Sequence, residues 1–285
     1  MTVREPLPLL APDEPPPVRV TPGENWSWLV VCDHASRRFP RALGEMGLSD
    51  ADSRDHIAWD IGGLDAARRL ATRLNAPLIE CGYSRLVIDC NRYPHKHDAA
   101  PEVSDRRRIP GNEDLSPQAR DARVAEIFIP YHQAIAAHLD AALAKGIRPV
   151  FLSVHTCTAR MGGKDRPWEI GVGWTRDART AAPLLAALEA RGDVVVGDNE
   201  PYGLDLGLDF TTPEHAMTRG LAHLQIEFRN DLVTTQETAE AWADKLFEAI
   251  TSIEDQAGWR QEDHHLTESD GILGDGNLDR FLSPR

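Results

Sequence analysis

Short apolar runs alternate with helical patterns along most of this chain, and this alternation restricts the possible folds most strongly. Residues 26–32 (WSWLVVC), 149–155 (PVFLSVH) and 221–228 (LAHLQIEF) are short and rich in β-branched residues, which predicts strands. They are too apolar for a sheet that has one face in water. The sequence therefore predicts an α/β fold of three layers, in which a mixed, mostly parallel central sheet carries helices on both faces.

The other expected elements follow from the same period analysis. A helix that starts with Ser116 as its cap and Pro117 in its first turn is expected to end at Gly146 and to kink at Pro130. Residues 91–115 form a connection long enough to be either functional or poorly ordered. Further strands are expected at 77–81, 85–90, 169–174 and 194–196, and further helices at 64–74, 179–190 and 235–253.

One α/β domain is expected to span residues 1–285. Seven prolines lie within residues 5–22, so residues 1–24 are interpreted as an extended arm. Residues 259–285 are interpreted as a polar, irregular tail. No internal linker separates the remaining chain into two parts.

Charge and cysteine content exclude several classes of function. The formal net charge of −14 disfavours nucleic acid and anionic membrane as partners, because both select basic surfaces. No apolar run approaches the ~20 residues of a membrane span. The four cysteines form no CxxC pair and are interpreted as reduced, inert thiols of a cytoplasmic protein. The sequence does not indicate an oligomeric state.

Polar side chains follow several of the expected strands where each one ends. In open α/β sheets, sites form at the carboxyl ends of the strands. Two histidines with carboxylates are typical of a catalytic Zn²⁺ that keeps one position open. These strand-end residues are Asp33, His34, Asp89, Asn91, Arg92, His155, Glu227 and Arg229.

Six motifs extend over most of the expected core. They are residues 32–36 (CDHAS), 56–63 (HIAWDIGG), 84–92 (SRLVIDCNR), 153–156 (SVHT), 197–202 (GDNEPY) and 226–232 (IEFRNDL). Together they resemble the N-formylglutamate amidohydrolase family. The resemblance implies a fold like that of zinc carboxypeptidases and phosphorylase/hydrolase-like proteins. It implies metal-dependent hydrolysis of a small N-acyl amino acid, typically N-formyl-L-glutamate to formate and glutamate. It also implies that His34 and His155 bind the metal.

The third metal ligand departs from the carboxypeptidase pattern. A glutamate would be expected three residues beyond His34, but Arg37 stands there and cannot bind a metal. Asp60 is our choice, with His56 as the alternative; Asp33 is possible but is expected to point the other way. Asp60 could instead cap the helix that follows Gly62.

Glu227 is the expected general base, which takes a proton from a metal-activated water and delivers it to the leaving amine. Gln225, Glu227 and Arg229 are expected to share one strand face, while Ile226 and Phe228 face the core. Glu227 could instead form a buried ion pair with Arg229 or Arg85.

Three arginines are among the expected substrate contacts. Arg85 is expected either to hold a carboxylate or to polarise the formyl oxygen, and the guanidinium of Arg92 suits a bidentate grip on a carboxylate. A surface ion pair is the alternative for each arginine. The predicted substrate-binding residues are Asn91, Arg92, Arg229, Tyr202 and His215.

The sequence therefore predicts a zinc-dependent amidohydrolase whose partner is a small N-acyl amino acid with carboxylate groups. Two alternatives remain open. The same fold could act on another N-acyl amino acid or a short peptide, or it could be a binding protein without catalysis.

Overall fold

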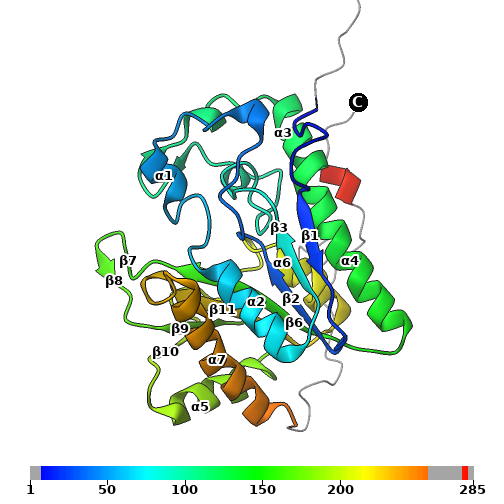
Figure 1. Ribbon diagram of the computed structural model, residues 1–285, viewed down its shortest axis with the longest axis vertical. Coiled ribbons are helices and arrows are strands. Elements are labelled where there is room, and N and C mark those ends of the chain that lie inside the picture. The colour runs from blue at the N-terminus through cyan, green and yellow to red at the C-terminus, as the bar shows by residue number, and fades with distance from the viewer. Residues whose placement is uncertain (1–7, 256–277, 282–285) are drawn as a thin grey trace, which may run out of the picture.

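The computed structural model describes residues 8–255 and 278–281, and a seven-stranded sheet forms its centre (Figure 1). In spatial order the strands are β1 (Val18–Thr21), β3 (Leu78–Cys81), β2 (Trp28–Cys32), β6 (Val150–Cys157), β11 (His223–Arg229), β9 (Ile170–Gly173) and β10 (Val196–Asp198). β3, β2, β6 and β11 run parallel to one another. β1 pairs antiparallel with β3, and β9 pairs antiparallel with β11 but parallel with β10. The fold class predicted from the sequence is confirmed.

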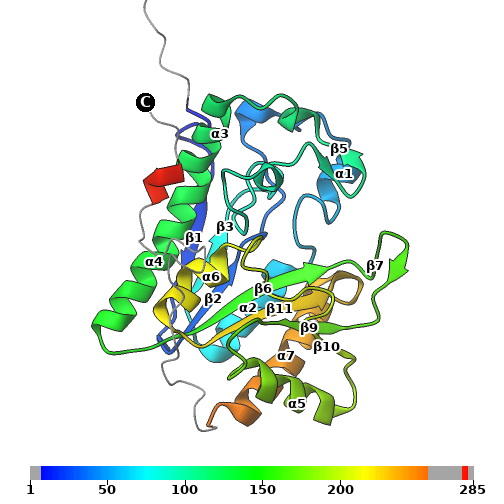
Figure 2. The same cartoon turned by 180° about the vertical axis from the view of Figure 1, so that it is seen from behind.

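Helices cover both faces of this sheet. α2 (Gly63–Leu74), α5 (Ala181–Arg191) and α7 (Gln236–Ile253) lie on one face, and α4 (Ile129–Ala144) lies on the other (Figures 1 and 2). The shorter elements are α1 (Asp50–Arg54), α3 (Pro117–Arg123), α6 (Thr211–His215), a hairpin of β4 (Val103–Ser104) and β5 (Arg107–Arg108), and a hairpin of β7 (Arg160–Met161) and β8 (Lys164–Asp165).

The apolar strands are buried on both sides, as their composition predicts. In β2, Trp28 and Val30 pack into the core under α2 and α7, while Leu29 and Val31 pack into the core under α4. Successive side chains of a strand point to opposite faces, so each central strand supplies both cores. This is why its sequence reads as a continuous apolar run rather than an alternating one.

The prediction of a strand at 85–90 is wrong. This segment is irregular and buried, and its Leu86, Val87 and Ile88 belong to the core on the α4 side. Its backbone bonds to loops instead of to a strand: the Asp89 N–H donates to the Ala99 carbonyl oxygen at 2.7 Å. An apolar run predicts burial, but it does not identify the backbone's hydrogen-bond partner.

Three smaller differences concern the ends of elements. The proline-rich arm contains β1, which adds an edge to the sheet by pairing Val18 with Cys81. The expected strand at 194–196 lies slightly later, as β10. The helix that starts at Ser116 is interrupted by a π-helical turn, Val124–Phe128, just before Pro130, whose nitrogen cannot donate a hydrogen bond.

Most of the tail expected at 259–285 lies outside the described residues. Of that tail, the structure describes a short 3₁₀ helix, Leu278–Phe281. Within the described part of the chain, every helix is too short or too polar to cross a membrane.

Candidate active site

A cavity of about 470 Å³ opens at the carboxyl ends of β2, β6 and β11. This is the edge of the sheet where the sequence predicts the site, and it collects residues that lie far apart in the chain. Gln225 and Glu227 both line the cavity, whereas Ile226 and Phe228 pack into the core, as their alternation predicts. The predicted site residues in its lining are His34, Asp60, Arg85, Asn91, Arg92, His155, Tyr202 and Glu227.

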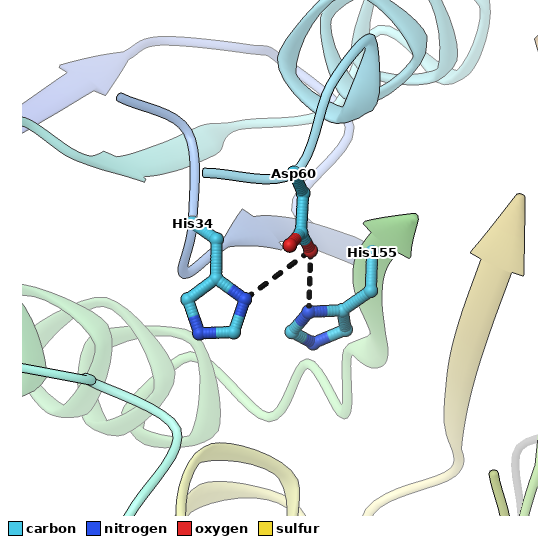
Figure 3. A group of neighbouring side chains, drawn as sticks. All are labelled: His34, Asp60 and His155. Carbon is cyan, nitrogen blue, oxygen red and sulfur yellow. Dashed lines mark hydrogen bonds and ion pairs between the residues drawn. The ribbon is translucent and has the colours of Figure 1, made fainter. Parts of the chain in front are cut away.

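His34, Asp60 and His155 form a buried group of neighbouring side chains (Figure 3), and all three line this cavity. The Nδ1 atoms of both imidazoles lie 3.2 Å from Oδ2 of Asp60. Donor atoms from the three residues lie within 4.8 Å of one another, so the group could hold a metal ion. His34 follows β2, His155 lies in β6 and Asp60 precedes α2.

Asp60 does not cap α2, because Gly62 occupies the cap position with a left-handed backbone (φ 77°). Its carboxylate instead accepts hydrogen bonds from the Thr156 backbone N–H at 3.2 Å and from Arg85 at 3.3 Å. The alternative third ligand, His56, lines the same cavity but lies between Asp55 at 2.7 Å and Asp105 at 3.4 Å. The structure thus favours Asp60 over His56.

Each imidazole of the group has a second carboxylate on its other nitrogen. Nε2 of His34 lies 2.8 Å from Asp89, and Nε2 of His155 lies 3.3 Å from Asp33. Burial opposes the charged imidazoles, but the surrounding carboxylates outweigh it and raise the pKa of both His34 and His155. Burial also opposes the Asp60 anion, yet His34, His155 and Arg85 hold its pKa below the usual range.

The sequence did not predict that Asp33 and Asp89 contact the imidazoles, although both residues lie in the motifs described above. Asp33 accepts hydrogen bonds from the Tyr131 hydroxyl at 2.7 Å and the Thr211 hydroxyl at 2.9 Å. Sequence spacing could not reveal these bonds, because Tyr131 and Thr211 come from distant helices.

Glu227 lies next to His155, because the two residues are register partners in the parallel pair of β11 and β6. Its side chain lines the cavity, and its Oε2 atom has no hydrogen-bond partner within residues 8–255 and 278–281. Burial raises the pKa of this carboxyl from 4.5 to about 7. A carboxyl with such a pKa can both accept and return a proton near neutral pH.

Two arginines of the lining are fixed by carboxylates. Arg85 donates to Asp60 and, at 2.7 Å, to Asp89. Arg92 donates to Asp209 at 3.0 Å. Asn91 also donates to Asp209, while its side-chain oxygen accepts the N–H groups of Phe210 and Thr211 at the start of α6. Nothing in the spacing of the sequence had singled out Asp209.

Two residues predicted to contact substrate lie outside the cavity lining. The Arg229 guanidinium turns away at the end of β11 and donates to Asp231 and to the Pro167 carbonyl oxygen. The His215 imidazole is buried and lies 2.9 Å from the His132 imidazole. The structure therefore places both side chains outside the cavity lining, where each is engaged with other groups.

A central parallel sheet with a polar, convergent cavity at the ends of its strands is the arrangement of an α/β enzyme. The sequence profile of the N-formylglutamate amidohydrolase family matches residues 26–234. The chain belongs to this family, which places it among the amidohydrolases and confirms the resemblance seen in its motifs.

The solved structures that are similar to this chain include two crystal structures. The gene product Atu2144 from Agrobacterium tumefaciens is 35% identical, with a TM-score of 0.80, over 87% of this chain and 100% of that chain. An N-formylglutamate amidohydrolase from Ralstonia eutropha JMP134 is 18% identical, with a TM-score of 0.57, over 83% of this chain and 96% of that chain; this likeness shows the fold alone. No curated protein matches the chain.

Proposed function

We propose that this protein is a metal-dependent amidohydrolase that cleaves the amide bond of a small N-acyl amino acid, such as N-formyl-L-glutamate. The observation that carries the proposal is the position of Glu227, which lies beside a buried group of two imidazoles and a carboxylate. The family membership supports hydrolysis of an amide.

The chemistry of the buried group fits a zinc ion. Two imidazole nitrogens and one carboxylate are a common ligand set of catalytic zinc, and Asp33 and Asp89 orient the imidazoles from behind. His34, Asp60 and His155 would hold the ion. When bound, a zinc ion supplies Lewis-acid activation of water and of the amide carbonyl.

Glu227 then performs the proton transfers of the reaction. As a carboxylate it takes a proton from the water that attacks the acyl carbon, and it returns this proton to the amine that leaves. The pKa of about 7 suits both steps, because neither protonation state of Glu227 is costly near neutral pH.

The arginines position the substrate. Arg85 lines the cavity and is held by Asp60 and Asp89, so its guanidinium is fixed where it can donate to the amide oxygen as negative charge develops there. Arg92 and Asn91 also line the cavity, and they bind the α-carboxylate of the amino acid.

The test of this proposal is the Glu227→Gln variant, with zinc content measured alongside turnover of N-formyl and N-acetyl amino acids. We expect wild-type protein to hold one zinc ion and to release the free amino acid. The variant should keep its zinc and lose about 10²- to 10⁴-fold in kcat, because its amide cannot accept the proton.

Glu237→Gln is the matched control, since Glu237 is exposed in the first turn of α7 and should leave kcat unchanged. Full activity of Glu227→Gln would remove Glu227 as the base. Turnover of short peptides alone would identify a peptidase, and stoichiometric zinc without turnover of any amide would indicate a binding protein.

A further inference from the structure

Arg166 lies beside the cavity, at the base of the β7–β8 hairpin. Its backbone N–H donates to the Ala159 carbonyl oxygen at 2.8 Å, which closes the hairpin directly after β6. Figure 2 shows the hairpin projecting beyond the carboxyl end of β6, the strand that carries His155. The hairpin thus places Arg166 on the same side of the sheet as the metal group.

The Arg166 guanidinium contacts three side chains of the cavity lining. It donates to the Tyr202 hydroxyl at 2.7 Å, to the Met161 sulfur at 3.2 Å and to the Thr158 hydroxyl at 3.3 Å. It also lies over the Tyr202 ring, with Cζ 4.7 Å from the ring centroid. These contacts fix the guanidinium at the wall of the cavity.

All three acceptors are neutral, and a thioether sulfur is a weak one. Arg85 and Arg92 are each paired with carboxylates, whereas no carboxylate of the described chain forms an ion pair with Arg166. Arg166 is therefore a positioned cation whose charge is not yet matched, which is the condition for binding an anionic group.

An N-acylated acidic amino acid needs a cation of this kind for its side-chain carboxylate. Under the proposed function, Arg85 is committed to the amide oxygen and Arg92 to the α-carboxylate, so a second carboxylate on the substrate side chain requires a further cation. Thr158, which Arg166 contacts, is three residues beyond His155, about 10 Å along an extended chain. This separation suits a side chain that extends from an amide held at the metal group.

We propose that Arg166 binds the side-chain carboxylate of an N-acylated acidic amino acid and thereby selects acidic over neutral substrates. This proposal rests on the proposed function and deepens it. A carboxylate bound there replaces the Met161 sulfur as acceptor, and the guanidinium remains stacked on Tyr202. Arg166 is a specificity-determining residue that takes no part in the proton transfers.

The test compares two ligands of nearly the same shape, N-formyl-L-glutamate and N-formyl-L-glutamine. Binding is measured by calorimetry on zinc-loaded Glu227→Gln protein, which binds without turnover, with and without Arg166→Gln. We expect Arg166→Gln to weaken binding of the glutamate ligand by about 10- to 100-fold and to leave the glutamine ligand within about two-fold. Arg166→Lys, which keeps the charge, should recover part of the loss.

Arg160→Gln is the matched control, because Arg160 lies in the same hairpin, is exposed and already pairs with Asp165. It should leave both affinities unchanged. If Arg166→Gln weakens binding of both ligands equally, Arg166 has a structural role and the proposal is overturned. The proposal is also overturned if Arg166→Gln weakens binding of neither ligand, or if neither ligand binds.

Turnover by wild-type protein tests the proposed function separately. If no N-formyl amino acid is hydrolysed but the calorimetric selectivity depends on Arg166, the proposed function fails and the carboxylate site stands. If N-formyl-L-glutamate is hydrolysed and Arg166→Gln does not alter its binding, the carboxylate site fails and the proposed function stands.

Discussion

At the scale of single residues, the imidazoles of His34 and His155, the proposed zinc ligands, are each held by a carboxylate outside the cavity lining. Asp33 lies 3.3 Å from Nε2 of His155 and is itself held by Tyr131 and Thr211. A carboxylate in this position fixes the tautomer that keeps a proton on Nε2, so that Nδ1 is free to bind a metal. We therefore expect Asp33 to act as a positioning residue for the proposed zinc ligand His155.

Replacing Asp33 by asparagine should weaken zinc binding by about 10- to 100-fold. An amide has the same shape, but it lacks the charge that favours a proton on the facing nitrogen. Competition with a chromophoric chelator measures the zinc dissociation constant. Asp209→Asn is the matched control, because Asp209 lies in the same cavity and hydrogen-bonds to Arg92 and Asn91 rather than to an imidazole. If both variants lose the same affinity, the imidazole contact is not the cause.

At the scale of elements, the start of α2 places Asp60. Gly62 has a φ of 77°, and a Cβ added there would lie 2.0 Å from the Val233 carbonyl oxygen. The Gly63 N–H donates to the Asp60 carbonyl oxygen at 3.0 Å, so the tight turn before α2 includes the proposed metal ligand Asp60. A side chain at position 62 would force the turn away from Val233.

Gly62→Ala should therefore lower both the free energy of unfolding and the affinity for zinc. A left-handed alanine costs about 1–2 kcal/mol, and displacing a packed backbone costs about 1–3 kcal/mol more. Gly146→Ala is the control, because Gly146 has a similar φ of 72° with open space around it. This variant therefore loses only the stability that a left-handed alanine costs. Urea unfolding of both variants measures the difference. Equal losses at the two positions would contradict a role for the contact with Val233.

The sequence predicts helices and strands well where hydrophobic periodicity or a helix-capping residue determines them. β2, β6 and β11 were found because their residues are buried on both sides, and α3 because Ser116 caps it and Pro117 starts it. The buried run at 85–90 has the same composition as a strand, but its backbone bonds to loops. β1 was hidden in a proline-rich segment, since its pairing with β3 depends on a distant partner.

The candidate site was predictable to a similar degree. His34, Asp60, His155 and Glu227 stand at strand ends or in strong motifs, and the fold brings them to one cavity. Arg229 shares a strand face with Glu227, yet its long side chain turns at the strand end to Asp231. The contacts of Arg166 could not be predicted, because they depend on how a hairpin folds back over Tyr202.

At the scale of the whole molecule, the proposed zinc ligands and the carboxylate behind His34 join segments that pack into different cores. His34 follows β2, Asp60 precedes α2 on one face of the sheet, and Asp89, which contacts His34, belongs to the buried segment whose apolar neighbours pack on the other face. A zinc ion bound by His34, Asp60 and His155 would connect the two cores through the contact between His34 and Asp89. If zinc binds the folded state and not the unfolded state, it stabilises the entire protein by mass action.

Removal of zinc with a chelator should lower the Tm of the wild-type protein. A ligand at 100 times its dissociation constant adds about 2.7 kcal/mol, which corresponds to a shift of about 4–5 °C for a chain of 285 residues. Differential scanning calorimetry with and without chelator measures the shift. Glu227→Gln should show the same shift, because its metal ligands are intact, whereas Asp60→Asn should show little or none. An unchanged Tm in chelated wild-type protein, or an equal shift in Asp60→Asn, would mean that no ion at this group holds the two cores together.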